Sequence, residues 1–290
     1  MRRLLAVRFA ALGLIGLLSP AFAADYDLPI LRGSDMFVPA TPTFFSWQGP
    51  YAGGQVGFTS ATADFSRATQ PMVAFSLRNS TILEQMTPDQ WQVLGKSSNG
   101  AATFGGFVGY NFQWDSAVIG LELNYAHSSL DFAPPSSSLA REQTVNGLID
   151  DVNIDASGRM HISDFLTTRA RFGWAIDRFL PYGAIGIAVG RADVALATVV
   201  SGTETDPNTP NPFPPPATFP IPRVVGVFSY SNSTAKNGAF MYGYSGAVGF
   251  DYAFTQSIFA RAEYEYIQWA RLFSIAPSMH NLRAGLGVKF

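Results

Sequence analysis

Eight segments alternate apolar side chains with polar or very small ones, and this alternation most constrains the fold. They cover residues 51–61, 102–114, 117–127, 162–174, 180–192, 239–254, 257–267 and 281–290. Successive side chains of a strand point to opposite faces, so period-two alternation over such lengths predicts long strands with two different faces. In the last segment, Leu282, Leu286 and Val288 alternate with polar residues or glycine, and the sequence stops on Phe290.

The connections between these segments alternate between long and short. Long connections cover 61–100, 128–160 and 193–238, with a shorter one at 268–278, and tight turns lie at 115–116, 176–179 and 255–256. An even number of strands joined in this way predicts an all-β fold, an eight-stranded antiparallel up-and-down transmembrane β-barrel with long extracellular loops. The register of the fifth segment stays open, because Ile185, Ile187 and Val189 fall on the face opposite Tyr182.

Composition separates this barrel from a soluble one such as a lipocalin. Charged residues make up 14% of the chain, aromatic residues 14%, and there are 27 glycines and no cysteine. The few charges share a face with glycine and serine, whereas aromatic residues gather near the strand ends, as a lipid-facing exterior requires. The net charge of −2 gives no sign of nucleic-acid binding.

The beginning of the sequence has the pattern of a secretory signal peptide. Arg2 and Arg3 precede an apolar run, and Ala21 and Ala23 form a small-x-small cleavage site. We therefore expect a signal peptide over 1–23, a Pro-rich periplasmic lead-in over 24–48 and an outer-membrane β-barrel over 49–290. The expected location is the outer membrane of a Gram-negative cell.

A balanced set of charges falls on the expected inner face, a few residues along each strand from the tight turns. The set is Glu122, Arg169, Arg171, Asp251, Arg261, Glu263, Glu265 and Arg283. Because unpaired charge is costly in a narrow interior, we expect these four acids and four bases to pair. An eight-stranded barrel has room only for side chains, so a structural plug is favoured over an ion constriction, and acid–base catalysis is disfavoured.

Weaker signals lie outside the strands. Asp151, Asn153 and Asp155 are spaced like the start of a calcium loop, but no glycine stands sixth and no glutamate closes it, so a solvated acidic loop is favoured. Three scattered histidines, His127, His161 and His280, do not form a metal or haem motif. No metal or cofactor is therefore expected.

Two long connections contain recognisable local sequences. Thr87 as N-cap, Pro88 at N1, Gln90 at N3 and Gly95 as the stop predict a short helix in the first of them. The proline-rich stretch at 206–222 predicts an extended spacer, with a recognition epitope as the alternative.

Several stretches resemble a known family. "FSWQGPYAGGQVGF", "FLTTRARFGWA", "LPYGAIGIAVG", "GYSGAVGFDYAF", "ARAEYEYI" and "NLRAGLGVKF" are similar to successive signatures of small outer-membrane β-barrel proteins of alphaproteobacteria. These porin-family or surface-antigen proteins are relatives of the OmpA-like barrels. The resemblance implies an eight-stranded outer-membrane barrel, whose members have been linked to envelope integrity, host contact, haem binding and modest pore activity.

The sequence therefore predicts a non-enzymatic barrel with a structural and surface-interaction role. A narrow diffusion channel for ions or small solutes is the alternative, and haem or host-ligand binding by the loops is a third. The expected partners are outer-membrane lipids, host or environmental ligands at the loops, and the outer-membrane assembly machinery. The C-terminal residues Leu282, Leu286, Val288 and Phe290 resemble the signal that this machinery reads.

Overall fold

The computed structural model describes residues 45–208 and 222–290. The strands are β1 (Gly49–Asp64), β2 (Lys96–Trp114), β3 (Ala117–Phe132), β4 (Ser137–Val145), β5 (Leu148–Trp174), β6 (Phe179–Asp206), β7 (Arg223–Ala253), β8 (Ile258–Trp269) and β9 (Ala276–Lys289). Two short helices, α1 (Gln70–Ser76) and α2 (Thr81–Met86), and a 3₁₀ turn, η1 (Pro88–Gln90), lie between β1 and β2. Among the described residues, no helix is long and apolar enough to cross a membrane.

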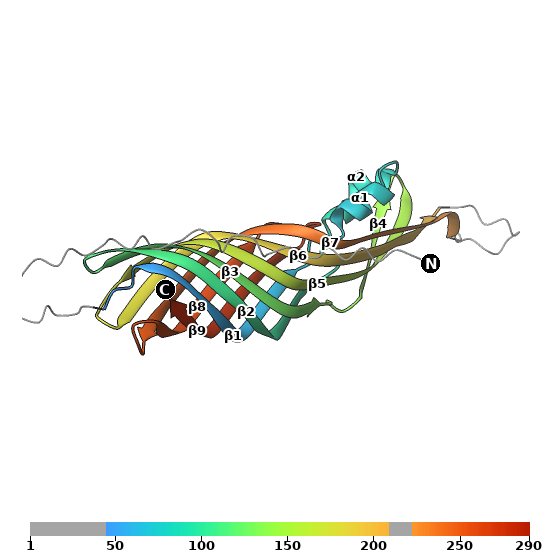
Figure 1. Ribbon diagram of the computed structural model, residues 1–290. Helices are drawn as coiled ribbons and strands as arrows, with labels where there is room; N and C mark the ends of the chain where they lie inside the picture. The colour runs from blue at the N-terminus through green and yellow to red at the C-terminus, as the bar shows by residue number, and fades with distance from the viewer. Residues whose placement is uncertain (1–44, 209–221) are drawn as a thin grey trace, which may run out of the picture. The chain divides into compact units, whose positions relative to one another are not determined.

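Eight of these strands close into an antiparallel ring, which confirms the predicted fold class. The hydrogen-bonded order is β3-β2-β1-β9-β8-β7-β6-β5, and β3 pairs with β5 to complete the ring (Figure 1). The first strand pairs with the last, from Tyr51 opposite Lys289 to Asp64 opposite Ala276. Closure of this kind leaves no free sheet edge within the barrel wall.

Three strands continue far beyond the ring. The lengths of β5, β6 and β7 are 27, 28 and 31 residues. A transmembrane strand needs only about ten residues. The additional strand β4 pairs with the outer part of β5, so β4, β5, β6 and β7 form a four-stranded sheet beyond the barrel. We call this sheet, together with α1, α2 and η1, the extension.

The extension corrects the expectation that 128–160 and 193–238 are loops. Most of their described residues are strand, and Asp151, Asn153 and Asp155 lie within β5. Of the predicted proline-rich spacer at 206–222, residues 209–221 lie outside the described residues. The predicted signal peptide with Ala21 and Ala23 lies outside them too, and only residues 45–48 of the lead-in are described.

The predicted short helix after Thr87 is present only as the 3₁₀ turn η1, with Thr87 as its N-cap and Pro88 as its first residue. Thr87 has a left-handed backbone with a φ of 46°, and its side chain makes no cap hydrogen bond. The helix start lies earlier, at Ser80, whose hydroxyl accepts a hydrogen bond from the Ile82 amide and caps α2.

The register of the fifth predicted strand, β6, is resolved by the structure. Tyr182 and Ala184 face the barrel interior, whereas Ile185 and Ile187 face outward. The interior position of Tyr182 explains why its large side chain breaks the simple pattern of apolar residues outside and small residues inside.

Candidate functional site

The eight charged residues predicted for the barrel interior lie together in one layer, which we call the charge layer. All eight side chains are buried. Arg169 donates to Glu263 over 2.8 Å and to Glu265 over 3.1 Å, and it also pairs with Glu122. Four acids therefore meet four bases in a closed network.

The other arginines complete this network. Arg261 donates to Asp251 over 2.9 Å and to Glu122 over 2.7 Å. Arg283 contacts Glu263 over 2.6 Å and Glu265 over 2.7 Å, and Arg171 pairs with Asp251. Because each buried carboxylate meets at least one guanidinium, the layer satisfies the pairing that a low-dielectric interior demands.

Inward aromatic side chains take part in the charge layer, and the sequence reading did not identify them. The Tyr51 hydroxyl donates to Glu122 over 2.8 Å, and the Tyr182 hydroxyl donates to Glu263 over 2.7 Å. The Arg171 guanidinium lies 3.6 Å from the centre of the Tyr182 ring. The sequence does contain a signal for them. Tyr51 lies four residues before Gln55 in the same strand, so the two side chains point to the same face.

An aromatic floor closes the end of the barrel that holds the tight turns. Trp47 is buried there and packs edge-on against Phe45 and Phe259. Its indole N–H donates to the carbonyl of Asp177 over 3.1 Å, and its amide donates to the side chain of Gln113. Residues just before the first strand thus close the lumen at the end with the tight turns. Composition alone does not predict this closure.

The predicted assembly residues lie on the outer face of β9. Leu282, Leu286 and Val288 are exposed there, and Phe290 is 76% exposed. The Phe290 amide donates to the Pro50 carbonyl over 2.9 Å, which holds the chain end beside the first strand. Such exposure is what a lipid-facing strand requires.

A hydrophobic core fills the extension and continues into the adjoining end of the barrel. Ile154 of β5 and Val200 of β6 are fully buried and belong to one cluster with helix residues such as Val73 and Ile82. The helices α1 and α2 lie over the extended sheet (Figure 1). The opposite face of β5 carries Asp151 and Asp155, which are exposed.

Two acidic residues face each other inside this extension. Asp150 of β5 lies opposite Glu204 of β6 and is only 2% exposed. Burial raises the pKa of Asp150 above its ordinary value, and the nearby charge of Glu204 raises it further. The two carboxylates therefore repel each other when both are ionised.

The histidines lie apart on the outer surface, near the level where the extension begins. His127 Nδ1 is 2.8 Å from Asp164, and His161 Nδ1 is 3.1 Å from Asp131. His280 contacts the hydroxyl of Tyr264 over 2.7 Å. Among the described residues, no group of three or more His, Cys, Asp or Glu side chains has the arrangement of a metal site.

Comparison with known proteins gives the family. The model of the outer membrane protein beta-barrel domain matches residues 38–290. No curated protein matches the chain.

Similar solved structures include three bacterial proteins. The attachment invasion locus protein Ail of Yersinia pestis is 12% identical, with 84% of this chain and 99% of that chain covered and a TM-score of 0.33. Neisserial surface protein A is 12% identical, with 83% and 97% covered and a TM-score of 0.33. The N-terminal barrel domain of Pseudomonas aeruginosa OprF is 13% identical, with 84% and 98% covered and a TM-score of 0.29.

The family match spans nearly all of the described chain and agrees with the closed ring of strands. The chain belongs to the outer membrane protein beta-barrel domain family and is located in the outer membrane of Gram-negative cells.

Proposed function

We propose that the protein is a non-enzymatic, non-conducting outer-membrane barrel that presents the extension outside the cell as a surface for interactions. The observation that carries this proposal is the extension itself, a sheet with an apolar core that continues three barrel strands beyond the ring. A barrel that only stiffened the envelope would need strands of about ten residues and short connections. Building an apolar core beyond the membrane is consistent with a surface that contacts other molecules.

The interior supports a closed barrel over a diffusion channel. The aromatic floor around Trp47 fills the lumen at one level, and the charge layer fills it at the next. Beside the charge layer, Thr59 donates to Asn281 over 2.7 Å and Gln55 donates to Asn124 over 2.8 Å, and both asparagines also bond to members of the layer. Packed side chains at these levels support a closed lumen, in keeping with the small bore of an eight-stranded barrel.

The histidine–aspartate pairs do not favour an enzyme. In each pair the imidazole contacts a carboxylate, which is the orientation used in nucleophilic catalysis. Among the described residues, however, no serine or threonine hydroxyl hydrogen-bonds to the remaining nitrogen of His127 or His161. Both pairs also lie on the outer surface, and hydrogen bonding with solvent and lipid headgroups is the simpler role.

The first test is electrical. The refolded protein in planar bilayers should give no steady single-channel conductance, and Trp47→Ala should give none either, because the charge layer remains. A conductance in the parent protein that ion substitution shows to be selective would overturn the closed-barrel part of the proposal.

The second test removes the extension while keeping the barrel. Cross-strand partners give natural cut points at Asp64–Lys96, Phe132–Met160 and Val194–Lys236, each of which two-residue Asn-Gly turns can close. The trimmed protein should insert and keep heat-modifiable mobility, while cells expressing it lose attachment to immobilised serum proteins and cultured epithelial cells. Equal attachment by trimmed and complete protein at equal surface levels would contradict the proposal.

The carboxyl end is proposed to serve assembly. Phe290 makes a backbone hydrogen bond but its ring is largely exposed, so its contribution to packing is small. Deleting Phe290 should leave refolding into detergent nearly normal and should lower outer-membrane levels in cells. Normal membrane levels together with failed refolding would reverse these roles.

A further inference from the structure

The outer half of β7 is a sheet edge without a neighbour on one side. β7 pairs with β6 along its length, from Arg223 opposite Asp206 to Tyr252 opposite Phe179. On its other side, β7 pairs with β8 only from Gly243 onward. Within the described residues, the stretch 223–241 therefore directs the backbone groups of alternate residues toward no strand, whereas the Tyr242 carbonyl already accepts from the Ala270 amide.

Between two bulges, at Val225 and at Asn237–Gly238, this edge lacks the features that usually protect an exposed strand. It contains no proline, and Arg223 and Lys236 are its only charged residues. Val224, Val225 and Val227 are exposed and have the β-branched shape that favours strand pairing. Natural proteins commonly block such edges with proline, inward charges or a covering element, so a long unblocked edge indicates a pairing site.

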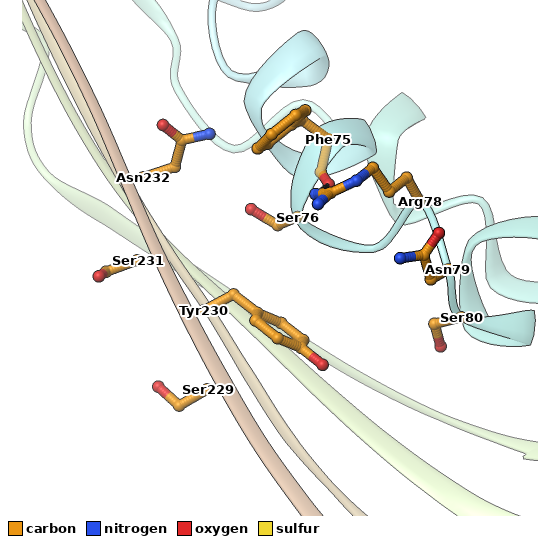
Figure 2. A pocket seen from close by; sticks show the side chains of 9 residues that line it. All are labelled: Phe75, Ser76, Arg78, Asn79, Ser80, Ser229, Tyr230, Ser231 and Asn232. Carbon is orange, nitrogen blue, oxygen red and sulfur yellow. Dashed lines mark hydrogen bonds between the residues drawn. The ribbon is translucent and has the colours of Figure 1, made fainter.

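A groove runs beside the edge, between β7 and the helices. Its volume is about 450 Å³, and it is lined by Phe75, Ser76, Arg78, Asn79, Ser80, Ser229, Tyr230, Ser231 and Asn232. Four consecutive strand residues take part, so the groove follows the edge of the strand and not only one face. Figure 2 shows the Tyr230 ring directed toward the helix side and the Ser229 and Ser231 side chains directed away from it.

The groove provides an apolar contact and a positive charge. Phe75 and Tyr230 are exposed on its two sides. The Arg78 guanidinium lies 4.1 Å from the centre of the Phe75 ring, and it donates to the Phe75 carbonyl over 2.6 Å, which fixes its position. No acidic residue lines the groove or interrupts the edge between Arg223 and Lys236.

We propose that this groove binds an extended acidic segment of a partner protein, which adds to the sheet as a strand beside β7. The proposal rests on the proposed function, because it names the partner that the extension would contact. Backbone hydrogen bonds to β7 supply affinity, and contacts with Phe75, Tyr230 and Arg78 select the side chains of the segment. Charge complementarity selects acidic residues because Arg78 is the only charged residue of the lining.

Two other occupants fit less well. Two copies in one membrane have the same orientation, so a two-fold axis that relates them makes their β7 strands parallel. Each residue would then lie opposite its own equivalent, and both would direct their backbone groups toward the other strand at the same height. In a parallel ladder a residue that bonds across the gap lies opposite one that bonds on the other side, so this pairing does not form. The chain's own segment 209–221 is rich in proline, which cannot donate to a ladder.

The test uses the refolded full chain in detergent and a defined pool of peptides. In the twelve-residue probe pool, Glu alternates with an equimolar mixture of Val, Ile, Thr and Tyr. The charge control replaces Glu by Lys, and two further pools carry N-methyl groups on all odd or all even residues. We expect saturable binding of the acidic pool, weaker binding of the Lys pool, and loss of binding for one methylated pool only.

That last contrast is specific for strand addition. A strand added to an edge uses the amide groups of one side, so methylation of the other side is tolerated. Binding through side chains alone would treat the two methylated pools alike and would overturn the proposal. So would the absence of saturable binding by the acidic pool.

Protein variants place the binding on β7. Arg78→Glu should lower the affinity for the acidic pool by about fivefold, which is the upper end of the effect of an exposed ion pair. Ser231→Pro and Asn232→Pro form a matched pair. Because neighbouring amide groups of a strand point to opposite sides, one substitution removes a donor to β6 and the other removes a donor at the free edge. The variant that loses the donor at the free edge, the edge variant, should keep protease protection of the extension and lose peptide binding.

Each remaining outcome decides the matter. If both proline variants are folded and bind normally, the strand is not the site and the proposal fails. If the parent protein forms dimers that the edge variant abolishes, the occupant is a second copy and the acidic-partner proposal is wrong. If trimming the extension abolishes cell attachment while no peptide pool binds, the proposed function stands and this inference alone fails.

Discussion

The strands β5, β6 and β7 each carry two opposite patterns along one continuous chain. In the barrel, polar side chains such as Arg169 and Asp251 face inward, and apolar ones such as Val248 face outward. In the extension, apolar side chains such as Ile154 face inward, and polar ones such as Asp155 face outward. The same hydrogen-bonded sheet therefore has the surface of a membrane protein over one length and that of a soluble protein over the next.

Bulges mark the change between these two patterns. The register shifts between His127 and Leu130 of β3, between Ile162 and Asp164 of β5, and between Ala192 and Val194 where β6 pairs with β7. A bulge adds a residue to one strand and so exchanges the faces of everything beyond it. In the barrel part of β5, from Phe165 to Arg171, the residues that face inward are odd-numbered. In the extension, from Ile162 back to Val152, they are even-numbered.

The two regions also differ in what holds them together. The barrel wall is stabilised against lipid by its closed ladder, and its interior is fixed by ion pairs that must all be matched. The extension is stabilised by burial of apolar side chains under α1 and α2, as in a soluble domain. Substitutions of one kind should therefore have very different effects in the two regions.

The largest effect is expected from Glu263→Ala in the charge layer. This substitution removes the carboxylate that accepts from Arg169, Arg283 and Tyr182, and it leaves buried guanidinium groups short of a partner. Loss of one member of a buried network should lower the free energy of unfolding by about 3–5 kcal/mol. Denaturant titration in detergent micelles, followed by heat-modifiable mobility, measures it.

Arg159→Ala is the control for that prediction. Arg159 pairs with Asp131 over 3.5 Å at the exposed outer surface, so its loss should cost less than about 1 kcal/mol. Equal losses for the two variants would mean that burial does not distinguish the two kinds of ion pair.

The next effect compares one residue type on one strand. Val248 is 62% exposed on the barrel exterior, and Val227 is 76% exposed on the extension. Val248→Arg places a cation in lipid and should cost about 2–4 kcal/mol, whereas Val227→Arg faces water and should stay within about 0.5 kcal/mol. Folding in lipid vesicles of both variants gives the comparison, with Ala247→Ser as an inward substitution of small effect. Similar costs at both valines would place the extension in the membrane.

The barrel was predictable from sequence because lipid enforces a strict rule. Every strand of the ring must show apolar residues to lipid, so the alternation around Val248 or Leu286 is uninterrupted and the turns are short. The positions of the eight inner charges followed from the same parity. The fifth segment was ambiguous because Tyr182, a large aromatic residue, faces inward to reach Glu263.

The strands of the extension are not predicted from the sequence, although part of β5 shows the alternation of a strand. Val152, Ile154 and Ala156 alternate with Asp151, Asn153 and Asp155, which is a strand pattern with a polar outer face. The same acidic residues are also spaced like the start of a calcium loop, so this segment carries two competing patterns. The bulge at Ser163 then broke the parity that would have joined this strand to the barrel strand, because a register change has no sequence signature of its own.

A smaller effect tests whether the two regions unfold independently. Ile154→Val removes one buried methyl group from the core of the extension and should cost about 0.5–1.5 kcal/mol there. Hydrogen exchange should quicken in the outer parts of β5 and β6, while amides of the charge layer keep their protection. Faster exchange throughout the barrel would show that the two regions form one cooperative unit.

The smallest effect is expected at Asp150, and it depends on pH. Its pKa in the folded protein is raised above the ordinary value of 3.8, first by burial and then by Glu204. The folded extension therefore favours the protonated acid, so the contribution of Asp150 to stability is greatest at low pH and falls as the pH rises through the raised pKa. Asp150→Asn should make the outer part of β5 more resistant to protease at neutral pH and change little near pH 4. Asp155→Asn, on the exposed face of the same strand, is the matched control. The assignment is wrong if Asp150→Asn and the parent protein lose resistance in parallel as the pH is raised, because the titrating group would then lie elsewhere.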